Sequence, residues 1–205
     1  SGVGIARAVS AGNATQIKVE DFLDFFATDD ETRVALTYIE NVSDGTSLLK
    51  SMENISRTKP LVVLKGGATA AGSRAAQSHT GAMASNDKVF LGATRAAGAI
   101  KVESVEEAFD TAATFSSQPL PKGNRVAILT TVGGWGVVTA DAIARDGILD
   151  LVELSDDLMT QLSEHLPPRW SRNNPIDCAG GETRDTVTDI MEIVAQHSSI
   201  DSLIF

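Results

Sequence analysis

Segments with the pattern of a β-strand alternate with segments that have the pattern of an α-helix, and this alternation constrains the fold most strongly. Four apolar residues beginning at Val19 have the i, i+3, i+4, i+7 spacing of one buried helix face, and the β-rich run 33–39 follows them. Parallel strands need a crossover segment between them, so the alternation predicts an α/β fold with a parallel sheet covered on both faces. Functional loops in such folds lie at the carboxyl ends of the strands.

A linker-like stretch, 116–124 (SSQPLPKGN), interrupts the alternation with two prolines, a glycine and no hydrophobic periodicity. We therefore expect a first domain over residues 1–118 and a second over residues 119–205. The first residue is not Met and the chain ends on a strand-like run, so we expect an excerpt of a longer protein with a truncated second domain. The expected strands cover 2–12, 33–39, 61–65, 99–102, 125–131, 148–154 and 201–205, and the expected helices cover about 19–26, 47–56, 87–97, 105–115, 133–146, 155–165 and 187–194.

The composition excludes several classes of protein. A net charge of −10 over 205 residues, without a stripe rich in lysine and arginine, argues against nucleic acid as a partner. No apolar run reaches the roughly 18 to 20 residues that span a bilayer, so we expect no membrane segment. One cysteine, Cys178, forbids an internal disulfide and suits the cytoplasm. The three histidines have no short metal-ligand spacing, so we predict no metal site.

The stretch Lys65–Ser85 (KGGATAAGSRAAQSHTGAMAS) follows an apolar run and is rich in glycine, small hydroxyl residues and alanine. Glycine lets backbone amides approach a phosphate closely, and a following helix offers unpaired N–H groups, so we expect a phosphate-binding loop here. The loop carries His79, whose neutral imidazole nitrogen can attack phosphorus and hold the phosphoryl group. Gly81 and the turn after it are the expected anion cradle. A solvent-exposed loop histidine is the alternative interpretation.

Phosphoryl transfer to His79 needs a carboxylate on the other ring nitrogen, which fixes the tautomer and stabilises positive charge on the ring. Glu40 is the expected partner. It follows the strand-like run 33–39, so it should lie at the sheet edge from which the loop emerges. A solvated glutamate at the end of a strand is the alternative.

A second glycine-rich turn follows the strand-like run 125–131. Gly133, Gly134 and Gly136 open a helix there and resemble a phosphate-binding turn, although the full G-x-G-x-x-G spacing is absent. A tight strand-to-helix turn without a ligand is the alternative. Trp135, between these glycines, is either a packing plug or a lid over a phosphate site.

The irregular stretch 173–181 (NNPIDCAGG) also allows two interpretations. It can orient backbone amides toward an anion, or it can hold the shape of a loop by Asx-turn chemistry. His165 and His197 have the positions of helix-terminal residues that interact with carbonyl groups, and Cys178 is expected to be a buried structural thiol.

Six strings of this sequence are similar, in the same order, to strings of a known family: SAGN (10–13), DDETRVALTYIENVSDG (29–45), KPLVVLKGG (59–67), SRAAQSHTGAMAS (73–85), RVAILTTVGGWGVVTADAI (125–143) and NPIDCAGG (174–181). Together they resemble the NDP-forming acyl-CoA synthetases, relatives of succinyl-CoA synthetase that include ADP-forming acetate–CoA ligase. The resemblance covers essentially the whole chain, and SHTGA is its most specific part.

The resemblance implies two flavodoxin-like subdomains, each with a doubly wound parallel sheet. It also implies a CoA-binding domain N-terminal to this chain and an ATP-grasp domain, fused or in a partner subunit. CoA and ATP or ADP with Mg²⁺ would be bound mainly by those parts, and an oligomer is expected. In the family, acyl-CoA and phosphate give an acyl phosphate, a histidine accepts the phosphoryl group, and a mobile loop carries it to ADP, in reversible steps. The product is a small carboxylic acid.

Residue by residue, the resemblance implies that His79 is the phosphorylated histidine, Glu40 the carboxylate that stabilises it, and Gly81 the glycine of the SHTGA string. It matches the glycines of 133–136 to a turn that opens a helix at the phosphate site. Relatives commonly carry a small residue or proline where this chain has Trp135. A non-catalytic regulatory module of a protein acetyltransferase is the alternative function, and a flavin-binding flavodoxin fits the fold pattern alone.

Overall fold

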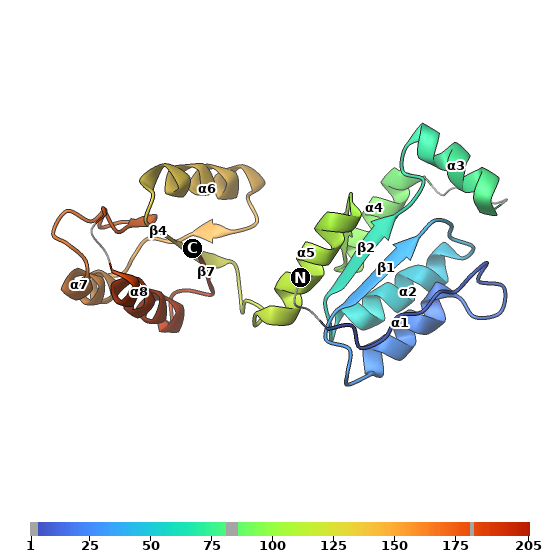
Figure 1. The fold of residues 1–205 in the computed structure, drawn as a ribbon, viewed down its shortest axis with the longest axis horizontal. Helices are drawn as coiled ribbons and strands as arrows, with labels where there is room; N and C mark the ends of the chain where they lie inside the picture. Colours follow the sequence, from blue (N-terminus) through green and yellow to red (C-terminus); the bar gives the residue numbers. More distant parts are fainter. Residues whose placement is uncertain (1–3, 81–85, 181–182) are drawn as a thin grey trace. The chain divides into compact units, whose positions relative to one another are not determined.

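The chain divides into two compact units, Ser1–Pro119 (unit 1) and Leu120–Phe205 (unit 2), each with its own sheet (Figure 1). The computed structural model describes residues 4–80, 86–180 and 183–205, and for residues 77–80 it describes the backbone alone. In both units the strands are parallel and hydrophobic cores lie on both faces of the sheet. The predicted α/β class is therefore confirmed.

The described residues of unit 1 form the parallel strands β1 (Ala35–Ile39), β2 (Leu61–Lys65) and β3 (Ile100–Val102) and the helices α1 (Val19–Thr28), α2 (Gly45–Ser56), α3 (Ala70–Thr80), α4 (Asp87–Ala96) and α5 (Val105–Ser117). The sheet has the order β1-β2-β3, so β2 is central. All five residues of β2 are buried. Its unbroken apolar run is typical of a parallel strand covered on both faces.

Successive residues of β2 belong to two different cores, because side chains alternate between the faces of a strand. Val63 packs into a core with residues of α1, α2 and α4. Val62 packs on the opposite face, in a core that contains Ala108 of α5. Helices on both faces hold the sheet, and its carboxyl edge is where the loops that follow β1 and β2 begin.

The described residues of unit 2 form the strands β4 (Arg125–Thr130), β5 (Asp150–Leu151), β6 (Ile176–Asp177) and β7 (Ser202–Ile204) and the helices α6 (Gly133–Asp146), α7 (Asp156–His165) and α8 (Arg184–Gln196). β4 is the central strand and pairs in parallel with the three others. Val126 and Ile128 of β4 share a core with α6, whereas Ala127 and Leu129 share one with α7 and α8.

The side chain of Asn174 fills a gap along β4, which pairs with β5 near its start and with β6 at its end. Asn174 Oδ1 accepts the backbone N–H of Ile128 at 2.9 Å. Its Nδ2 donates to the carbonyl oxygens of Val126 and Val152, each at 2.9 Å. The predicted strand 148–154 is therefore too long: only Asp150–Leu151 form β5, and an asparagine side chain takes over the pairing beyond them.

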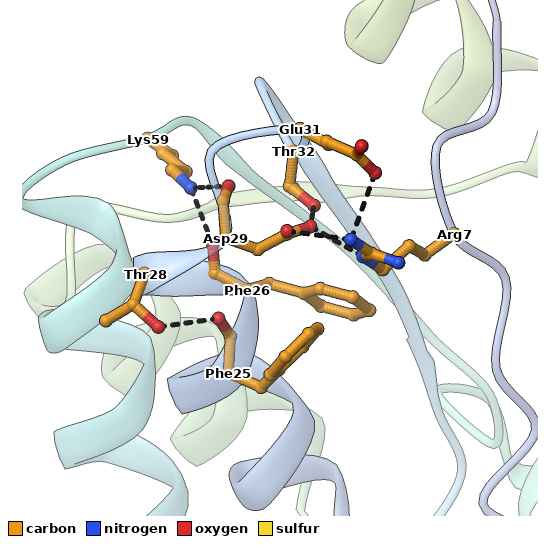
Figure 2. A network of polar contacts seen from close by, with 8 residues as sticks. All are labelled: Arg7, Phe25, Phe26, Thr28, Asp29, Glu31, Thr32 and Lys59. Atoms are coloured by element: carbon orange, nitrogen blue, oxygen red, sulfur yellow. Dashed lines mark hydrogen bonds and ion pairs between the residues drawn. The ribbon is translucent and has the colours of Figure 1, made fainter.

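The predicted strand 2–12 is wrong, since its described residues form neither strand nor helix and are mostly exposed. Arg7 instead holds this segment against the end of α1 (Figure 2). Its Nε donates to Asp29 Oδ2 at 2.8 Å, and its second amino group reaches Glu31 Oε2 at 3.0 Å. Its guanidinium lies 5.7 Å from the centroid of the Phe25 ring. The hydrogen bond from Arg7 holds the pKa of Asp29 well below its usual range. This exposed segment is thus held by a charged anchor at Arg7 and not by the strand pairing that the sequence pattern predicted.

The predicted loop 65–85 is also corrected, because α3 covers Ala70–Thr80 and therefore includes the backbone of His79. The alanine-rich sequence of this part favours a helix. Thr69 Oγ1 accepts the backbone N–H of Gly72 at 3.0 Å, which satisfies a donor at the start of the helix. The irregular part between β2 and α3 is only Gly66–Thr69.

Candidate functional site

Glu40 lies at the carboxyl end of β1, beside the first glycine of the segment that leads to α3. Ile39 pairs with Lys65 in the parallel ladder, and the Gly66 N–H donates to the Ile39 carbonyl oxygen at 2.9 Å, which extends the pairing by one residue. A Cβ added to Gly66 would lie 3.1 Å from Glu40 Cγ, closer than ordinary van der Waals contact. The structure thus brings Glu40 together with the start of the predicted phosphate segment.

Tyr38 lies on β1, two residues before Glu40, and its hydroxyl donates to Glu40 Oε1 at 3.0 Å. Partial burial raises the pKa of Tyr38, and the hydrogen bond to Glu40 and the charge of that carboxylate raise it further. Tyr38 was not among the site residues predicted from the sequence. The available signal was the i, i+2 spacing between Tyr38 and Glu40 at the end of a predicted strand, which places the two side chains on one face if the backbone stays extended.

Lys65 ends β2 and stabilises the backbone that follows it. Its side chain is buried, and its Nζ donates to the Gly66 carbonyl oxygen at 2.8 Å and lies 5.5 Å from the centroid of the Phe90 ring. Burial lowers the pKa of Lys65. Gly67 has a φ of +74°, a left-handed conformation that favours glycine. The hydrogen bond from Lys65 to the Gly66 carbonyl oxygen and the left-handed conformation of Gly67 therefore both shape the turn after β2.

The structure describes only part of the predicted phosphohistidine segment. The backbone of His79 lies in the last turn of α3, but its side chain and the whole of Gly81 lie outside the described residues. The pairing of Glu40 with His79 therefore stays a prediction.

The glycine-rich turn of unit 2 forms the N-terminus of α6, directly after β4. The Asp177 carboxylate lies against Gly133, so that a Cβ at this position would overlap Oδ2 of Asp177. A Cβ on Gly136 would lie 3.0 Å from Thr130 Cγ2, whereas a Cβ on Gly134 would meet nothing within 4 Å. A side chain at 133 would therefore have to displace the Asp177 carboxylate, and one at 136 would press on Thr130 and Pro175, whereas packing leaves 134 unconstrained.

The first turn of α6 has the properties of an anion-binding helix end. Its N-cap, Val132, provides no side-chain hydrogen bond, and the turn contains no acidic residue. Its first N–H groups and the positive end of the helix dipole suit an anion. The nearby Asp177 carboxylate accepts, through Oδ1, the N–H of Ala179 in the loop after β6, at 2.9 Å. Trp135 is 69% exposed, so within unit 2 it is not a packing plug.

The remaining histidines interact with carboxylates, and not with carbonyl groups as the sequence analysis expected. His197 Nε2 lies 3.0 Å from Asp157 Oδ2, and His165 Nδ1 lies 3.9 Å from Asp189 Oδ2. Cys178 is buried, as expected. Within the described part of the chain, no cluster of three or more His, Cys, Asp or Glu residues is arranged to hold a metal ion. No helix among those residues is long and apolar enough to cross a membrane.

Two family models match this chain: the succinyl-CoA ligase like flavodoxin domain over residues 1–115, and the ligase-CoA domain over residues 126–205. Acetate–CoA ligase (ADP-forming) I subunit alpha of Pyrococcus furiosus is 38% identical over 87% of this chain and 38% of its own length. The II subunit alpha of the same organism is 34% identical over 98% of this chain and 44% of its own length. The 4-hydroxybutyrate–CoA ligase (ADP-forming) of Nitrosopumilus maritimus is 33% identical over 99% of this chain and 29% of its own length.

Solved structures are also similar to this chain. The dinucleotide forming acetyl-coenzyme A synthetase 1 of Ca. Korarchaeum cryptofilum, in complex with phosphate and ADP, matches with a TM-score of 0.87 and 34% identity. The match covers 95% of this chain and 42% of that one. The structure of PH0766 from Pyrococcus horikoshii OT3 matches with a TM-score of 0.76 and 28% identity, over 95% of this chain and 40% of that one. This chain thus spans less than half the length of the relatives named here.

Proposed function

Because this chain belongs to the family of ADP-forming acyl-CoA ligases, we propose that the full protein containing it is an NDP-forming acyl-CoA ligase. The proposed overall reaction is reversible: acyl-CoA, phosphate and ADP give a carboxylic acid, CoA and ATP. A phosphate oxygen attacks the acyl carbon and the CoA thiolate leaves, which gives an acyl phosphate. A ring nitrogen of His79 then attacks phosphorus, and the carboxylate leaves as the P–O bond breaks. A terminal oxygen of ADP finally takes the phosphoryl group from His79.

In this proposal, Glu40 accepts the N–H of the second ring nitrogen of His79. The carboxylate fixes the tautomer that leaves the attacking nitrogen unprotonated, and it stabilises the positive charge that develops on the ring. Gly81 contributes backbone N–H groups to the phosphoryl oxygens. The position of Glu40 carries the proposal, because it lies at the carboxyl end of β1 and against Gly66, where the segment leading to His79 begins.

We also propose that Gly133, Gly134 and Gly136 bind phosphate. The uncapped first turn of α6 supports this role, since its backbone donors are oriented along the helix axis and its dipole favours negative charge. A phosphorylated histidine carries a dianion that needs such donors and protection from water.

The proposed organisation has domain boundaries at 1–118 and 119–205. A CoA-binding domain precedes this chain, and an ATP-grasp domain, fused or in a partner subunit, binds ATP or ADP with Mg²⁺. Two relatives are named as alpha subunits, which supports a separate partner subunit. Relatives are named for acetate and 4-hydroxybutyrate, which supports a small carboxylic acid as the substrate.

Intact-mass analysis of the full-length protein after incubation with Mg-ATP tests this function. We expect a gain of one phosphoryl group, about 80 Da, that is lost in acid as expected of a phosphoramidate. The gain should be absent in His79→Ala and present in His165→Ala, a control histidine at the end of α7. Absence of the gain in the unmodified protein, with ATP binding shown separately, would reject the ligase and favour a regulatory module of a protein acetyltransferase.

A further inference from the structure

Tyr38 and Glu40 occupy the space that a side chain at position 66, a glycine in this chain, would otherwise fill. They are two residues apart along β1 and its continuation, so their side chains lie on the same face of the sheet. The neighbouring position on the adjacent chain segment is Gly66, which extends the β1–β2 pairing through its N–H. A Cβ on Gly66 would lie 2.5 Å from Tyr38 Oη and 3.1 Å from Glu40 Cγ. Any other residue at 66 would therefore displace the phenol, the carboxylate or both.

The phenol of Tyr38 forms a hydrogen bond with the Glu40 carboxylate. Tyr38 is 54% exposed, yet its hydroxyl donates to Glu40 Oε1 at 3.0 Å. The raised pKa of Tyr38 is consistent with a phenol that donates to a negatively charged group. A carboxylate can accept hydrogen bonds at both oxygens, so a donor on Oε1 also restricts the directions in which Oε2 can point.

We propose that Tyr38 is a positioning residue for phosphoryl transfer: its hydroxyl holds the Glu40 carboxylate in the orientation that accepts the N–H of His79. This inference rests on the proposed roles of Glu40 and His79. In this proposal Tyr38 acts through Glu40 and not directly on the phosphoryl group or the substrate. A glutamate has three rotatable bonds, so without the phenol the carboxylate would spend more time in orientations that do not meet the imidazole.

The rate of phosphorylation of the full-length protein by Mg-ATP, measured in a single turnover by quenched intact-mass analysis, tests the proposal. Tyr38→Phe keeps the ring over Gly66 and removes only the hydroxyl. We expect a rate about tenfold lower, because a hydrogen bond to a charged group is lost, and an unchanged concentration of Mg-ATP at half-saturation. Leu36→Val is the matched control, since it alters a partly exposed side chain two residues earlier on the same face of β1, and it should leave the rate unchanged.

A double-mutant cycle distinguishes positioning from a general structural effect. If Tyr38 acts through Glu40, Tyr38→Phe should cause no further loss in a Glu40→Ala background. An unchanged rate in Tyr38→Phe, or losses that multiply in the double variant, would overturn the positioning role. Phosphorylation that survives in His79→Ala would instead reject the proposed function, so the two failures are distinguishable.

Discussion

A side chain on Gly133 would overlap the carboxylate of Asp177 and would have to displace it. Asp177 ends β6 and Gly133 begins α6, so a contact between residues far apart in the sequence determines which residue can open this helix. The next glycine, Gly134, faces open space. Packing therefore constrains the first of these two adjacent glycines and not the second.

Gly133→Ala should destabilise the 205-residue chain by about 1–3 kcal/mol, because the new methyl group displaces the Asp177 carboxylate. Gly134→Ala should leave the free energy of unfolding unchanged or raise it by up to about 1 kcal/mol, since alanine is the better helix former. Urea denaturation followed by circular dichroism measures both changes. Equal effects of the two variants would mean that the Asp177 contact does not constrain position 133.

Tyr38 should ionise at a higher pH than a free tyrosine, because burial and Glu40 both raise its pKa. Glu40→Gln removes the negative charge next to the phenol and should shift the titration to lower pH. Tyr38 is the one tyrosine in the chain, so absorbance at 295 nm against pH reports it directly. Glu31→Gln, which changes an acidic side chain that binds Arg7, is the control and should leave the curve in place. A curve that is also unmoved by Glu40→Gln would contradict the contact.

The ion pair between Arg125 and Asp201 should make the stability of unit 2 depend on pH in the acidic range. Asp201 accepts from the Nε and an amino group of Arg125, each at 2.9 Å, and from the Arg125 backbone N–H at 3.0 Å. These contacts lower the pKa of Asp201 from 3.8 to about 2. The pKa is lower in the folded state, so the stabilisation is complete above the unfolded value near 4 and is lost as the pH falls through 2.

Melting temperatures between pH 6 and pH 2 test this dependence. Asp201→Asn should melt at a lower temperature than the unmodified chain at pH 6, and the difference should shrink toward pH 2. Asp141→Asn breaks an exposed pair with Arg145, 3.8 Å apart within α6, and should change little. If the difference in melting temperature between Asp201→Asn and the unmodified chain persists at pH 2, the destabilisation does not come from the charge of Asp201.

Asn174→Ala should destabilise the chain by roughly 2–4 kcal/mol, because it removes the acceptor of the buried Ile128 N–H and the donor to the Val152 carbonyl oxygen. The Val126 carbonyl oxygen also loses this donor but keeps the Val152 N–H at 3.3 Å. Asn173→Ala alters the exposed neighbour and should have an effect below about 0.5 kcal/mol. Chemical denaturation again measures both. Similar losses of stability in the two variants would mean that the hydrogen bonds from Asn174 to β4 are not the cause of the destabilisation.

The sequence predicted those elements whose signal is local. The apolar run of β2, the helical spacing that begins at Val19 and the glycine that ends α6 each depend on neighbouring residues, and the structure confirms all three. Residues 2–12 and 148–154 have β-type composition, but the first has no paired strand among the described residues and the second pairs only at Asp150–Leu151. A strand exists only where a second strand satisfies its backbone groups, and composition does not report that partner.

For the candidate site, the sequence by itself determined which residue types are present: a histidine in a glycine- and alanine-rich segment, a glutamate after a strand, and a glycine turn before a helix. The tertiary structure decided which of them meet. Parallel pairing of β1 with β2 places Glu40 beside Gly66, and the space left by that glycine admits Tyr38. The approach of β6 to α6 places Asp177 on Gly133. Such contacts depend on the register of strands and on the volume of side chains from distant segments, which no local pattern contains.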